Sequence, residues 1–456
     1  MTTRIDPITA AAGVLDLLRA ERFDELAGLF SPELSAAASP AAVRVGWTTE
    51  VGRIGGIGAV GPAVTEPLDG ELTLVKVPVT GERGAIEVRF SVDTAGALHG
   101  FRLAPPAGSA WAAPGYAVAR RFRERDVTLG SGDRAVPGTL TLPTRRGRRP
   151  AVILVSSGAM DRDVSFGPNK PFKDLAWGLA SRGIAVLRFD KVNFVHPELN
   201  SRDGFTMVEE YLPANLAAVE LLQRESRIDA HRIFVLGHSG GGKAVPRIVA
   251  AEPSIAGMAI LAGDTVPLPQ SAVRVFEYLA AQDPHHDRTE SLAAVTRAAE
   301  LTANPALSPG TPPADLLFGL PASYWLDLRT YDQVATAAAL HKPTLILQGG
   351  RDYQVTAEAD LPNWQAALAD RPEVSIRLHP AADHMFYPGN APSTPADLEK
   401  PNHVCPAVID DLAHWFTTTG RRNPITRFRS RRRDQPTRSN SGPRASRAQS
   451  SSEAAE

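Results

Sequence analysis

The chain has 456 residues, of which 43% are hydrophobic and 22% are charged, and its formal net charge is −1. This balance excludes a wholly disordered or fibrous chain, the length suits two or three domains, and the near-zero charge indicates no polyanionic partner such as nucleic acid. The single cysteine, Cys405, excludes an intramolecular disulfide and a cysteine-based zinc cluster, and no apolar run approaches the roughly 18 residues of a membrane span.

Residues 1–105 combine helical and strand patterns in one small unit. The N-terminus shows no export signal, because Asp6 and Asp16 interrupt its first helical stretch, so we expect a cytoplasmic protein. Helices followed by an antiparallel meander predict a small α+β domain. The helical apolar positions are Ile8, Ala11, Leu15, Leu18, Phe23, Leu26, Phe30, Val43 and Trp47, and the predicted strands cover 72–79, 85–92 and 97–103.

After a Pro- and Gly-containing linker at 106–119, strand and helix patterns alternate from residue 120 to 419. Several strand segments are continuous apolar runs, which is typical of parallel strands buried on both faces. The alternation predicts an open, mostly parallel α/β sheet. The predicted strands are 127–129, 138–142, 151–156, 184–189, 233–237, 257–262, 344–348 and 374–378, and the predicted helices include 206–224, 244–251 and a segment near 361–368 capped by Asp360.

Residues 265–340 show no strand pattern, and the segment is too long for a simple connection, so we predict an inserted helical cap. Its aromatic residues either line an apolar acyl pocket or pack the cap onto the sheet, and both interpretations stay open. These residues are Phe276, Tyr278, Phe318, Tyr324 and Trp325.

The C-terminal segment 420–456 is rich in Arg, Ser, Pro and Gln and poor in apolar residues. Residues 421–456 hold ten Arg against three acidic residues, a net charge of +7. Such a segment buries too little surface to offset its chain entropy, so we predict a disordered tail. We interpret it as a solubilising extension rather than a nucleic-acid tether, since no aromatic stacking platform accompanies the arginines.

Residues 237–242, with the sequence Gly-His-Ser-Gly-Gly-Gly, carry the strongest chemical signal. They join an apolar strand to a predicted helix, and Gly-x-Ser-x-Gly in that context is typical of a nucleophile elbow. The flanking glycines remove Cβ atoms that would clash in the sharp turn, and the helix N-terminus favours developing negative charge. We therefore interpret Ser239 as a nucleophile rather than as part of a purely structural glycine turn.

A serine hydroxyl is a weak nucleophile and needs a base together with a group that orients the base. In a sheet of this kind the chain order is serine, acidic residue, histidine. Asp352 and His384 each follow a predicted strand and satisfy this order. We expect His384 to take the proton from Ser239 and Asp352 to hold the imidazole in the correct tautomer.

Each of these assignments has a competitor. Asp264 also follows a strand and offers a carboxylate, and Asp352 alternatively caps its own loop. His403 lies after the last strand too, but a helix begins there. His238 lies in the elbow, where we expect it to pack or to support the serine, and we expect Asp383 to face away from the site.

Two backbone N–H donors are needed for an oxyanion hole. We expect one from Gly240, directly after the nucleophile, and the other from Gly158 or Ala159, in the loop that follows strand 151–156. The alternative for that loop is a plain turn. Expected substrate contacts are Met160, His238, Tyr324 and Trp325.

Four further sequence motifs accompany the elbow. They are Asp-Arg-Asp at 161–163, Gly-Pro-Asn-Lys-Pro-Phe at 167–172, Ser-Arg-Gly-Ile-Ala-Val-Leu-Arg-Phe-Asp-Lys at 181–191, and Leu-Gln-Gly-Gly-Arg-Asp-Tyr-Gln-Val at 347–355. With them the chain resembles bacterial α/β-hydrolases of the carboxylesterase type, close to the dienelactone-hydrolase and serine-aminopeptidase-like branches. The resemblance implies an α/β-hydrolase fold with Ser239, Asp352 and His384 as nucleophile, acid and base. The N-terminal unit resembles a cystatin-like domain of unknown function that precedes some of these hydrolases.

The chain departs from that family in the oxyanion loop. The family reads His-Gly-Ser-Gly-Pro after the third strand, whereas residues 155–159 read Val-Ser-Ser-Gly-Ala, which changes the shape of the loop although backbone donors can survive. Charged residues nearby lie next to apolar runs and must be paired if they are buried. We interpret Arg162, Asp163, Lys170 and Asp190 as a structural ion network at the mouth of the site rather than as catalytic groups.

These observations predict a serine hydrolase that cleaves a small-molecule carboxylic ester through an acyl-enzyme on Ser239, with no metal or cofactor. An amidase, a peptidase or an acyltransferase would use the same triad, so these activities remain alternatives. A non-catalytic binding protein would account for the altered oxyanion loop. Such a protein has no chemical need for serine, aspartate and histidine in this order.

Overall fold

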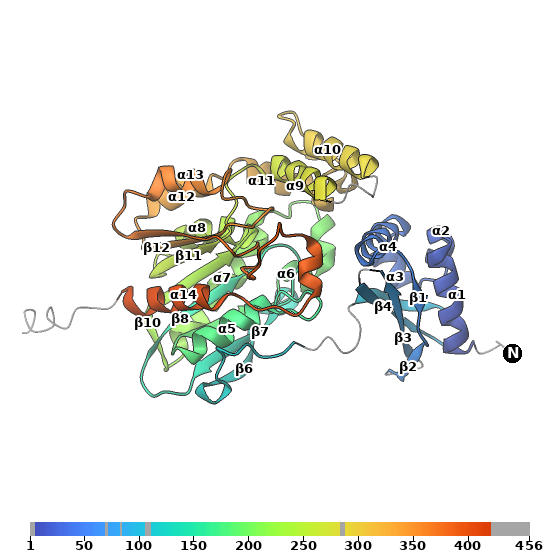
Figure 1. Ribbon diagram of the computed structural model, residues 1–456, viewed down its shortest axis with the longest axis horizontal. Coiled ribbons are helices and arrows are strands. Elements are labelled where there is room, and N and C mark those ends of the chain that lie inside the picture. The colour runs from blue at the N-terminus through green and yellow to red at the C-terminus, as the bar shows by residue number, and fades with distance from the viewer. Residues whose placement is uncertain (1–4, 69–71, 83, 105–110, 283–287, 421–456) are drawn as a thin grey trace, which may run out of the picture. The chain divides into compact units, whose positions relative to one another are not determined.

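The computed structural model describes residues 5–68, 72–82, 84–104, 111–282 and 288–420 (Figure 1). The tail predicted beyond residue 420 and the first part of the predicted linker lie outside these ranges. No helix among the described residues is long and apolar enough to cross a membrane.

The N-terminal part consists of helices followed by an antiparallel sheet, as predicted. Asp6 caps the first helix by accepting from the Thr9 amide, and Ser31 and Ser39 cap the third and fourth helices in the same way. The helices are α1 (Pro7–Arg19), α2 (Phe23–Ala27), α3 (Pro32–Ala37) and α4 (Pro40–Ile54), and the strands are β1 (Ala59–Val60), β2 (Val64–Pro67), β3 (Thr73–Gly81), β4 (Gly84–Val92) and β5 (Leu98–Ala104).

Two details of this part differ from the prediction. Ile8 is 56% exposed, because α1 turns Ala11, Val14, Leu15 and Leu18 toward the sheet instead. The strands β1 and β2 were not predicted, since they are short and their side chains are mostly exposed, which leaves no apolar alternation to recognise.

The second part is built on an eight-stranded sheet with the order β13-β12-β11-β10-β8-β9-β7-β6. All eight predicted strands are present, and β7 pairs antiparallel with both β6 and β9 while the other neighbours are parallel. The strands are β6 (Phe122–Leu129), β7 (Val136–Pro143), β8 (Arg149–Val155), β9 (Ala185–Phe189), β10 (Ile228–His238), β11 (Gly257–Leu261), β12 (Thr344–Gly349) and β13 (Val374–His379).

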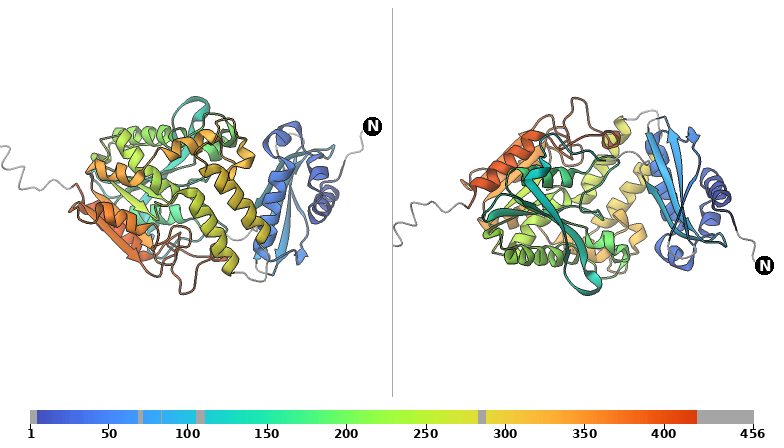
Figure 2. Two further views of the ribbon diagram at one scale, coloured as in Figure 1. Left: turned by 90° about the horizontal axis from the view of Figure 1, so that it is seen from above. Right: turned by 90° about the horizontal axis from the view of Figure 1, so that it is seen from below.

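Helices cover both faces of this sheet and enclose two hydrophobic cores, one on each side (Figures 1 and 2). One face carries α7 (Met207–Arg224), α8 (Gly240–Ala251), α12 (Gln333–Leu340) and α13 (Leu361–Leu368), and the other carries α5 (Pro171–Ser181) and α14 (Pro406–Thr418). Because the central strands are parallel, their carboxyl ends lie at one edge of the sheet, and sheets of this kind have their functional sites at that edge.

The segment predicted as a cap is helical in its described residues, with α9 (Leu268–Gln282), α10 (Thr289–Ala303) and α11 (Ala322–Arg329) before α12. A small core around Leu316, Leu317 and Trp325 holds these helices together. In α12, the last helix of this segment, Ala337 packs into the core beside the sheet.

Candidate active site

Ser239 occupies the sharp turn between β10 and α8. Its backbone has φ 56° and ψ −127°, a strained conformation that L-residues seldom adopt. Gly237 is required because a Cβ there would lie 2.2 Å from the Gly241 carbonyl oxygen, and Gly241 because its Cβ would lie 2.1 Å from the Val155 carbonyl oxygen. The glycines thus let the elbow close tightly on β8.

Asp352 and His384 meet at the same edge of the sheet, after β12 and β13. The His384 Nδ1 atom lies 2.8 Å from Asp352 Oδ2. The other carboxylate oxygen, Oδ1, accepts from the amides of Gln354 at 2.8 Å and Val355 at 2.9 Å, so the carboxylate is held in place. The Asp352 side chain therefore both caps its own loop and contacts the His384 ring.

The charge of Asp352 favours the protonated form of the His384 imidazole. Burial alone lowers the pKa of His384, but the charge and hydrogen bond of Asp352 outweigh it and raise the pKa above the ordinary 6.5. The side chains of His384 and Asp352 are 6% and 0% exposed, so solvent screens this interaction little. Asp352 thus stabilises an imidazolium at His384.

His238 lies beneath the proposed base rather than in a substrate position. Its Nε2 atom donates to the His384 carbonyl oxygen at 2.7 Å, and the two rings are 4.7 Å apart. Burial and the neighbouring His384 lower the pKa of His238 to about 3, so the ring stays neutral at physiological pH. It therefore supports the backbone of His384, whereas the sequence predicted that it would pack or support the serine.

The competitors for the triad have other partners. Asp264 pairs with Lys243 at 2.5 Å instead of contacting His384. Asp383 accepts from the amides of Met385 and Tyr387, so it closes a turn. His403 lies 3.1 Å from Asp174, whose pKa burial raises.

The loop after β8 and the start of α8 converge beside the nucleophile. Ser157, Gly158 and Ala159 line the same cavity as Ser239 and Gly240. A Cβ on Gly240 would lie 3.2 Å from the Ser157 Cβ atom, so the two segments are in contact. Because the first amides of a helix have no intrahelical acceptor, the Gly240 N–H is available to an oxyanion.

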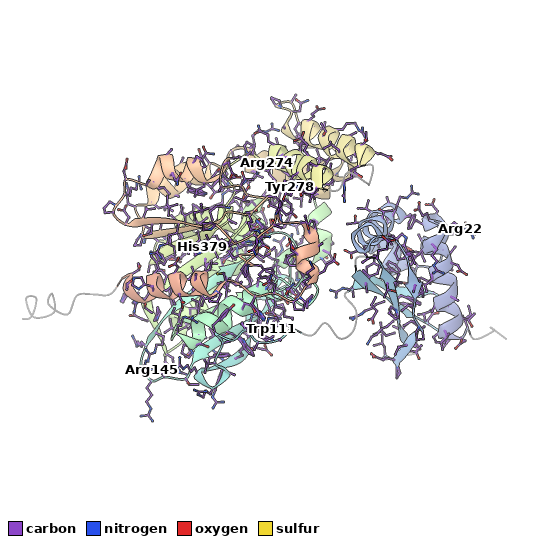
Figure 3. All side chains as sticks on the ribbon, viewed as in Figure 1. Arg22, Trp111, Arg145, Arg274, Tyr278 and His379 are labelled. Atoms are coloured by element: carbon purple, nitrogen blue, oxygen red, sulfur yellow. The ribbon has the colours of Figure 1, made fainter. Side chains whose placement is uncertain are left out.

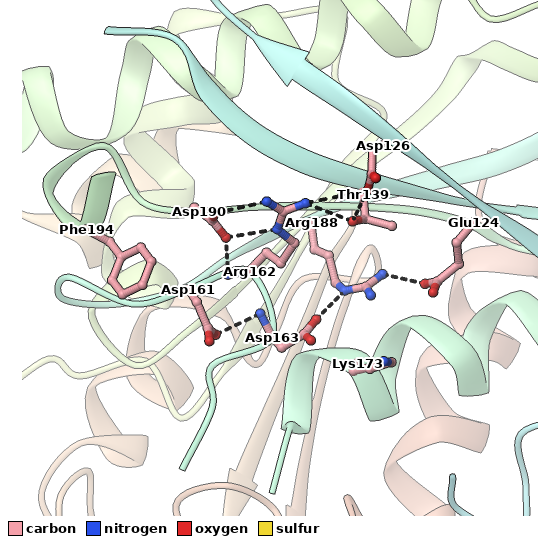
Figure 4. A pocket seen from close by; sticks show the side chains of 10 residues that line it. All are labelled: Glu124, Asp126, Thr139, Asp161, Arg162, Asp163, Lys173, Arg188, Asp190 and Phe194. Carbon is pink, nitrogen blue, oxygen red and sulfur yellow. Dashed lines mark hydrogen bonds and ion pairs between the residues drawn. The ribbon is translucent and has the colours of Figure 1, made fainter. Parts of the chain in front are cut away.

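The charged residues at 161–163 and 188–190 form a paired network, which agrees with their interpretation as structural (Figure 4). Asp190 accepts from Arg162 Nε at 2.9 Å and from the Arg162 amide at 2.7 Å. Arg188, which is 3% exposed, lies 2.7 Å from Asp163 Oδ1 and 2.8 Å from Glu124 Oε1. Burial alone raises the pKa of Asp163, but Arg188 and Lys170 outweigh it and hold that pKa below its ordinary value.

Replacing Arg188 with Met should destabilise the protein by about 3–5 kcal/mol at pH 7, because Asp163 and Glu124 would lose their shared cation in a largely buried place. Urea unfolding checks this. As a control, Arg182→Met breaks the pair with Asp410, whose side chain is 64% exposed, and should cost about 0–1 kcal/mol. Equal losses in both variants would contradict a structural role for the network.

A cavity of about 460 Å³ opens beside Ser239. Tyr324, predicted to contact substrate, lines it, as do the cap aromatics Phe276 and Phe318. Met160 and Trp325 were also predicted to contact substrate, but they lie outside this lining. Met160 packs against the core on the α5 face, and Trp325 packs inside the cap.

Helix α9 of the cap contacts the loop after β12, which contains Asp352, and the segment after β13. Arg274 lies 3.1 Å from Asp360 Oδ2 and donates to the Gln354 carbonyl oxygen, and Tyr278, one turn later, donates to the Ser393 carbonyl oxygen (Figure 3). Asp360 was predicted to cap α13 with its side chain. Its carboxylate instead accepts from the Thr265 amide and from Arg274, because the cap approaches it.

Sequence reasoning predicted Tyr324 but missed the ion pair of Lys191 with Glu210, of which Glu210 lines the cavity. Lys191 lies 3.0 Å from Glu210, and its Nζ atom lies 3.2 Å from the ring centroid of Tyr211. Tyr324 donates to the other oxygen of Glu210 at 2.6 Å. These residues come from separate segments and carry no shared motif, whereas Lys243 gave a local signal as a lone charge in the apolar start of α8.

Among the described residues, no group of three or more His, Cys, Asp or Glu side chains is arranged to hold a metal ion.

No protein-family model matches the chain. Esterase EstD of Thermotoga maritima is 35% identical over 337 residues, which are 74% of this chain and 77% of EstD. Among the solved structures that align is Est1E from Butyrivibrio proteoclasticus, with 18% identity and a TM-score of 0.43 over 64% of this chain and 99% of that chain. Another is dienelactone hydrolase from Anabaena variabilis, with 16% identity and a TM-score of 0.39 over 66% of this chain and 100% of that chain. The identity to EstD over most of both chains shows that this chain belongs to the α/β-hydrolase family of esterases to which EstD belongs.

Proposed function

We propose that the protein is a carboxylic ester hydrolase that works through an acyl-enzyme on Ser239. The observation that carries the proposal is the strained Ser239 turn at the same sheet edge as a buried Asp352–His384 pair with a 2.8 Å contact. Family membership with an esterase supports the substrate class.

In the proposed reaction, Ser239 Oγ attacks the acyl carbon while His384 Nε2 takes its proton. The charge that develops on the carbonyl oxygen is held by the Gly240 N–H and an amide of the loop with Gly158 and Ala159. His384 then gives its proton to the departing alcohol. A water molecule that gives its proton to His384 hydrolyses the acyl-enzyme, and Ser239 regains its hydrogen.

Each side chain has a defined task in this sequence. The imidazolium formed at His384 is stabilised by Asp352, which explains why burying a full carboxylate here is useful. The neutral His238 adds no positive charge next to the imidazolium. The N-terminus of α8 adds a favourable field at the oxyanion.

The proposal is tested by hydrolysis of p-nitrophenyl esters, from acetate to long acyl chains, beside the matching p-nitroanilides. We expect turnover of the esters and much slower turnover of the anilides. Turnover of anilides alone would assign an amidase instead. Turnover of neither class by folded protein would contradict the proposal.

A further inference from the structure

Tyr211 brings a hydroxyl group to the cavity beside the nucleophile. It lies in the first half of α7, and it lines the same cavity as Ser239 and Gly240. The residue is 2% exposed, and its backbone carbonyl oxygen accepts from Asn215. Its hydroxyl forms no hydrogen bond with any residue that the structure describes, whereas a buried hydroxyl ordinarily has a partner.

The Tyr211 hydroxyl is not shut off from the cavity. In the described part of the chain, some side-chain hydroxyls are fully buried and have no hydrogen-bond partner. Those of Tyr116 and Tyr387 are examples, but that of Tyr211 is not one of them. Because the Tyr211 hydroxyl has no partner either, it keeps a small accessible surface, and this surface faces the cavity that the residue lines.

The hydroxyl lies next to the first residue of α8. A Cβ atom on Gly240 would lie 3.6 Å from the Tyr211 hydroxyl oxygen and 3.2 Å from the Ser157 Cβ atom. Since the Cβ and N atoms of one residue are about 2.5 Å apart, the hydroxyl oxygen lies within about 6 Å of the Gly240 nitrogen. Two donors at that separation can share one acceptor oxygen between them, because each hydrogen bond spans about 2.7–3.0 Å.

Lys191 holds the Tyr211 ring and the oxyanion loop together. Its Nζ atom lies 3.2 Å from the centroid of the Tyr211 ring and 3.0 Å from Glu210. Its backbone N–H donates to the carbonyl oxygen of Met160, at the end of the loop after β8. The ring and the loop are therefore fixed by one residue, and donors that are fixed in advance stabilise a developing charge without the cost of reorganisation.

The Tyr211 hydroxyl keeps its proton in the pH range where His384 titrates. Burial, together with the charges of Glu210 and Asp264, raises the pKa of Tyr211 well above the ordinary value of 10. The phenol can therefore donate a hydrogen bond without bringing a charge of its own. Such a donor is most useful when the substrate oxygen becomes negative, because hydrogen bonds to a charged acceptor are about twice as strong as neutral ones.

We propose that the Tyr211 hydroxyl is a third donor of the oxyanion hole, beside the Gly240 N–H and an amide of the loop after β8. The inference rests on the proposed acyl-enzyme at Ser239. In both tetrahedral intermediates the former carbonyl oxygen of the substrate carries the negative charge, and the hydroxyl donates to it without transferring its proton. When the carbonyl re-forms, the oxygen is neutral again and the hydrogen bond weakens.

Tyr211→Phe removes the hydroxyl and keeps the ring, and its kinetics on p-nitrophenyl acetate and butyrate test the proposal. We expect kcat to fall about a hundredfold, the size of loss that follows removal of one oxyanion donor. KM should change by less than about threefold, because acylation and deacylation use the same oxyanion site. The melting temperature should not fall, since the hydroxyl has no protein partner to lose. A kcat within about threefold of wild type would overturn the inference.

A transition-state analogue gives a readout that a merely structural role would not move. When Ser239 Oγ bonds to the carbonyl carbon of a trifluoromethyl ketone, His384 takes the serine proton and the carbonyl oxygen becomes an oxyanion. Inhibition by trifluoromethyl hexyl ketone should weaken in Tyr211→Phe by the same factor as kcat/KM, about a hundredfold. Inhibition by methyl hexyl ketone, which adds serine far less readily, should change by less than about threefold. Equal losses for both ketones would overturn the inference.

Tyr331→Phe is the matched control. The Tyr331 hydroxyl also contacts α8, where it donates to the Lys243 carbonyl oxygen at 2.8 Å, but Tyr331 does not line the cavity. Its kcat should stay within about threefold of wild type, and a loss as large as that in Tyr211→Phe would count against the inference. Ser157→Ala tests a second hydroxyl beside Gly240. A large loss in Ser157→Ala with Tyr211→Phe unchanged would assign the donor to the loop instead.

The outcomes keep the two proposals apart. If wild-type protein cleaves esters and Tyr211→Phe loses nothing, the third donor is wrong and the proposed esterase stands. If Tyr211→Phe does not fold, Tyr211→Met takes its place under the same criterion, because methionine adapts to an irregular space and carries no hydroxyl. Folded wild-type protein that cleaves no ester would contradict the proposed function itself.

Discussion

Replacement of Ser239 by Ala is expected to lower kcat/KM for p-nitrophenyl esters by about a millionfold, which is the size of loss seen when a serine nucleophile is removed from a complete triad. The reason is that no other hydroxyl occupies the strained turn at φ 56°. Without an acyl-enzyme, only oxyanion stabilisation and substrate binding remain to favour hydrolysis over the reaction in water. Steady-state kinetics on purified variant and wild type measure the difference.

The control for this variant is Ser323→Ala. Ser323 lies at the start of α11 and donates to the Phe205 carbonyl oxygen, and it does not line the cavity. Its replacement should change kcat/KM by less than about threefold. A Ser239→Ala protein that keeps more than a hundredth of wild-type activity would show that another group performs the attack.

Replacement of Asp352 by Asn should lower kcat by about ten-thousandfold, because the amide keeps the shape of the carboxylate but no longer fixes the imidazole tautomer or stabilises its cation. The structure makes this effect large. Asp352 Oδ2 is 2.8 Å from His384 Nδ1, and the carboxylate is fully buried. Substrate binding does not use this pair, so KM should change little.

The pH profile gives a second readout of the same variant. His384 must be neutral to accept a proton, so activity is lost as the pH falls through its pKa. In the wild type that pKa is raised above 6.5, and the acidic limb of kcat/KM should lie above pH 6.5. In Asp352→Asn the two largest interactions that raise the pKa of His384 are gone, while burial, which lowers this pKa, remains. The residual activity should therefore persist to lower pH.

The matched control is Asp383→Asn, the neighbouring carboxylate. Burial raises the pKa of Asp383, and its Oδ1 atom accepts from two backbone amides, a task that an Asn side-chain oxygen can also perform. We expect kcat to stay close to wild type and the acidic limb to move to lower pH by less than in Asp352→Asn, because the charge of Asp383 raises the pKa of His384 less than Asp352 does. A loss in Asp383→Asn as large as that in Asp352→Asn would mean that the assignment of the acidic residue is wrong.

Local patterns sufficed for the framework of the second part. Each of its eight strands is a short apolar or alternating run. Ser239 directly follows one of them, and Asp352 and His384 lie in the loops that follow two others. Parallel strands place their carboxyl ends at one edge, so residues distant in sequence were expected together before their contacts were known. The contact of Asp352 with His384 agrees with that expectation.

The interactions that no local pattern encodes were the ones missed. Asp360 directly precedes α13 and looks like a helix cap, but the arrival of Arg274 from α9 gives its carboxylate different partners. Trp325 is as aromatic as Phe276, yet only Phe276 reaches the cavity. Which face of a cap helix turns inward depends on packing between segments, and composition alone does not decide it.

The buried ion pairs are a further example. Lys191 and Glu210 lie in different segments, and neither has a charged residue three or four positions away on a helix from which an ion pair could be predicted. The Lys243–Asp264 pair likewise forms only when α8 follows β10 and the next strand, β11, ends beside it. Asp264 was weighed as a catalytic carboxylate because of its position after a strand, and its contact with Lys243 explains that position differently.

The measurement that tests the central claim most directly is labelling of the folded protein with a fluorophosphonate probe, followed by peptide mapping of the adduct. The probe reacts with a serine only where a base and an oxyanion site activate it. We predict one adduct, on Ser239, whose formation slows strongly in Asp352→Asn but not in Asp383→Asn. Folded protein that takes up no label, or that is labelled at another residue while Ser239 stays free, would contradict the account.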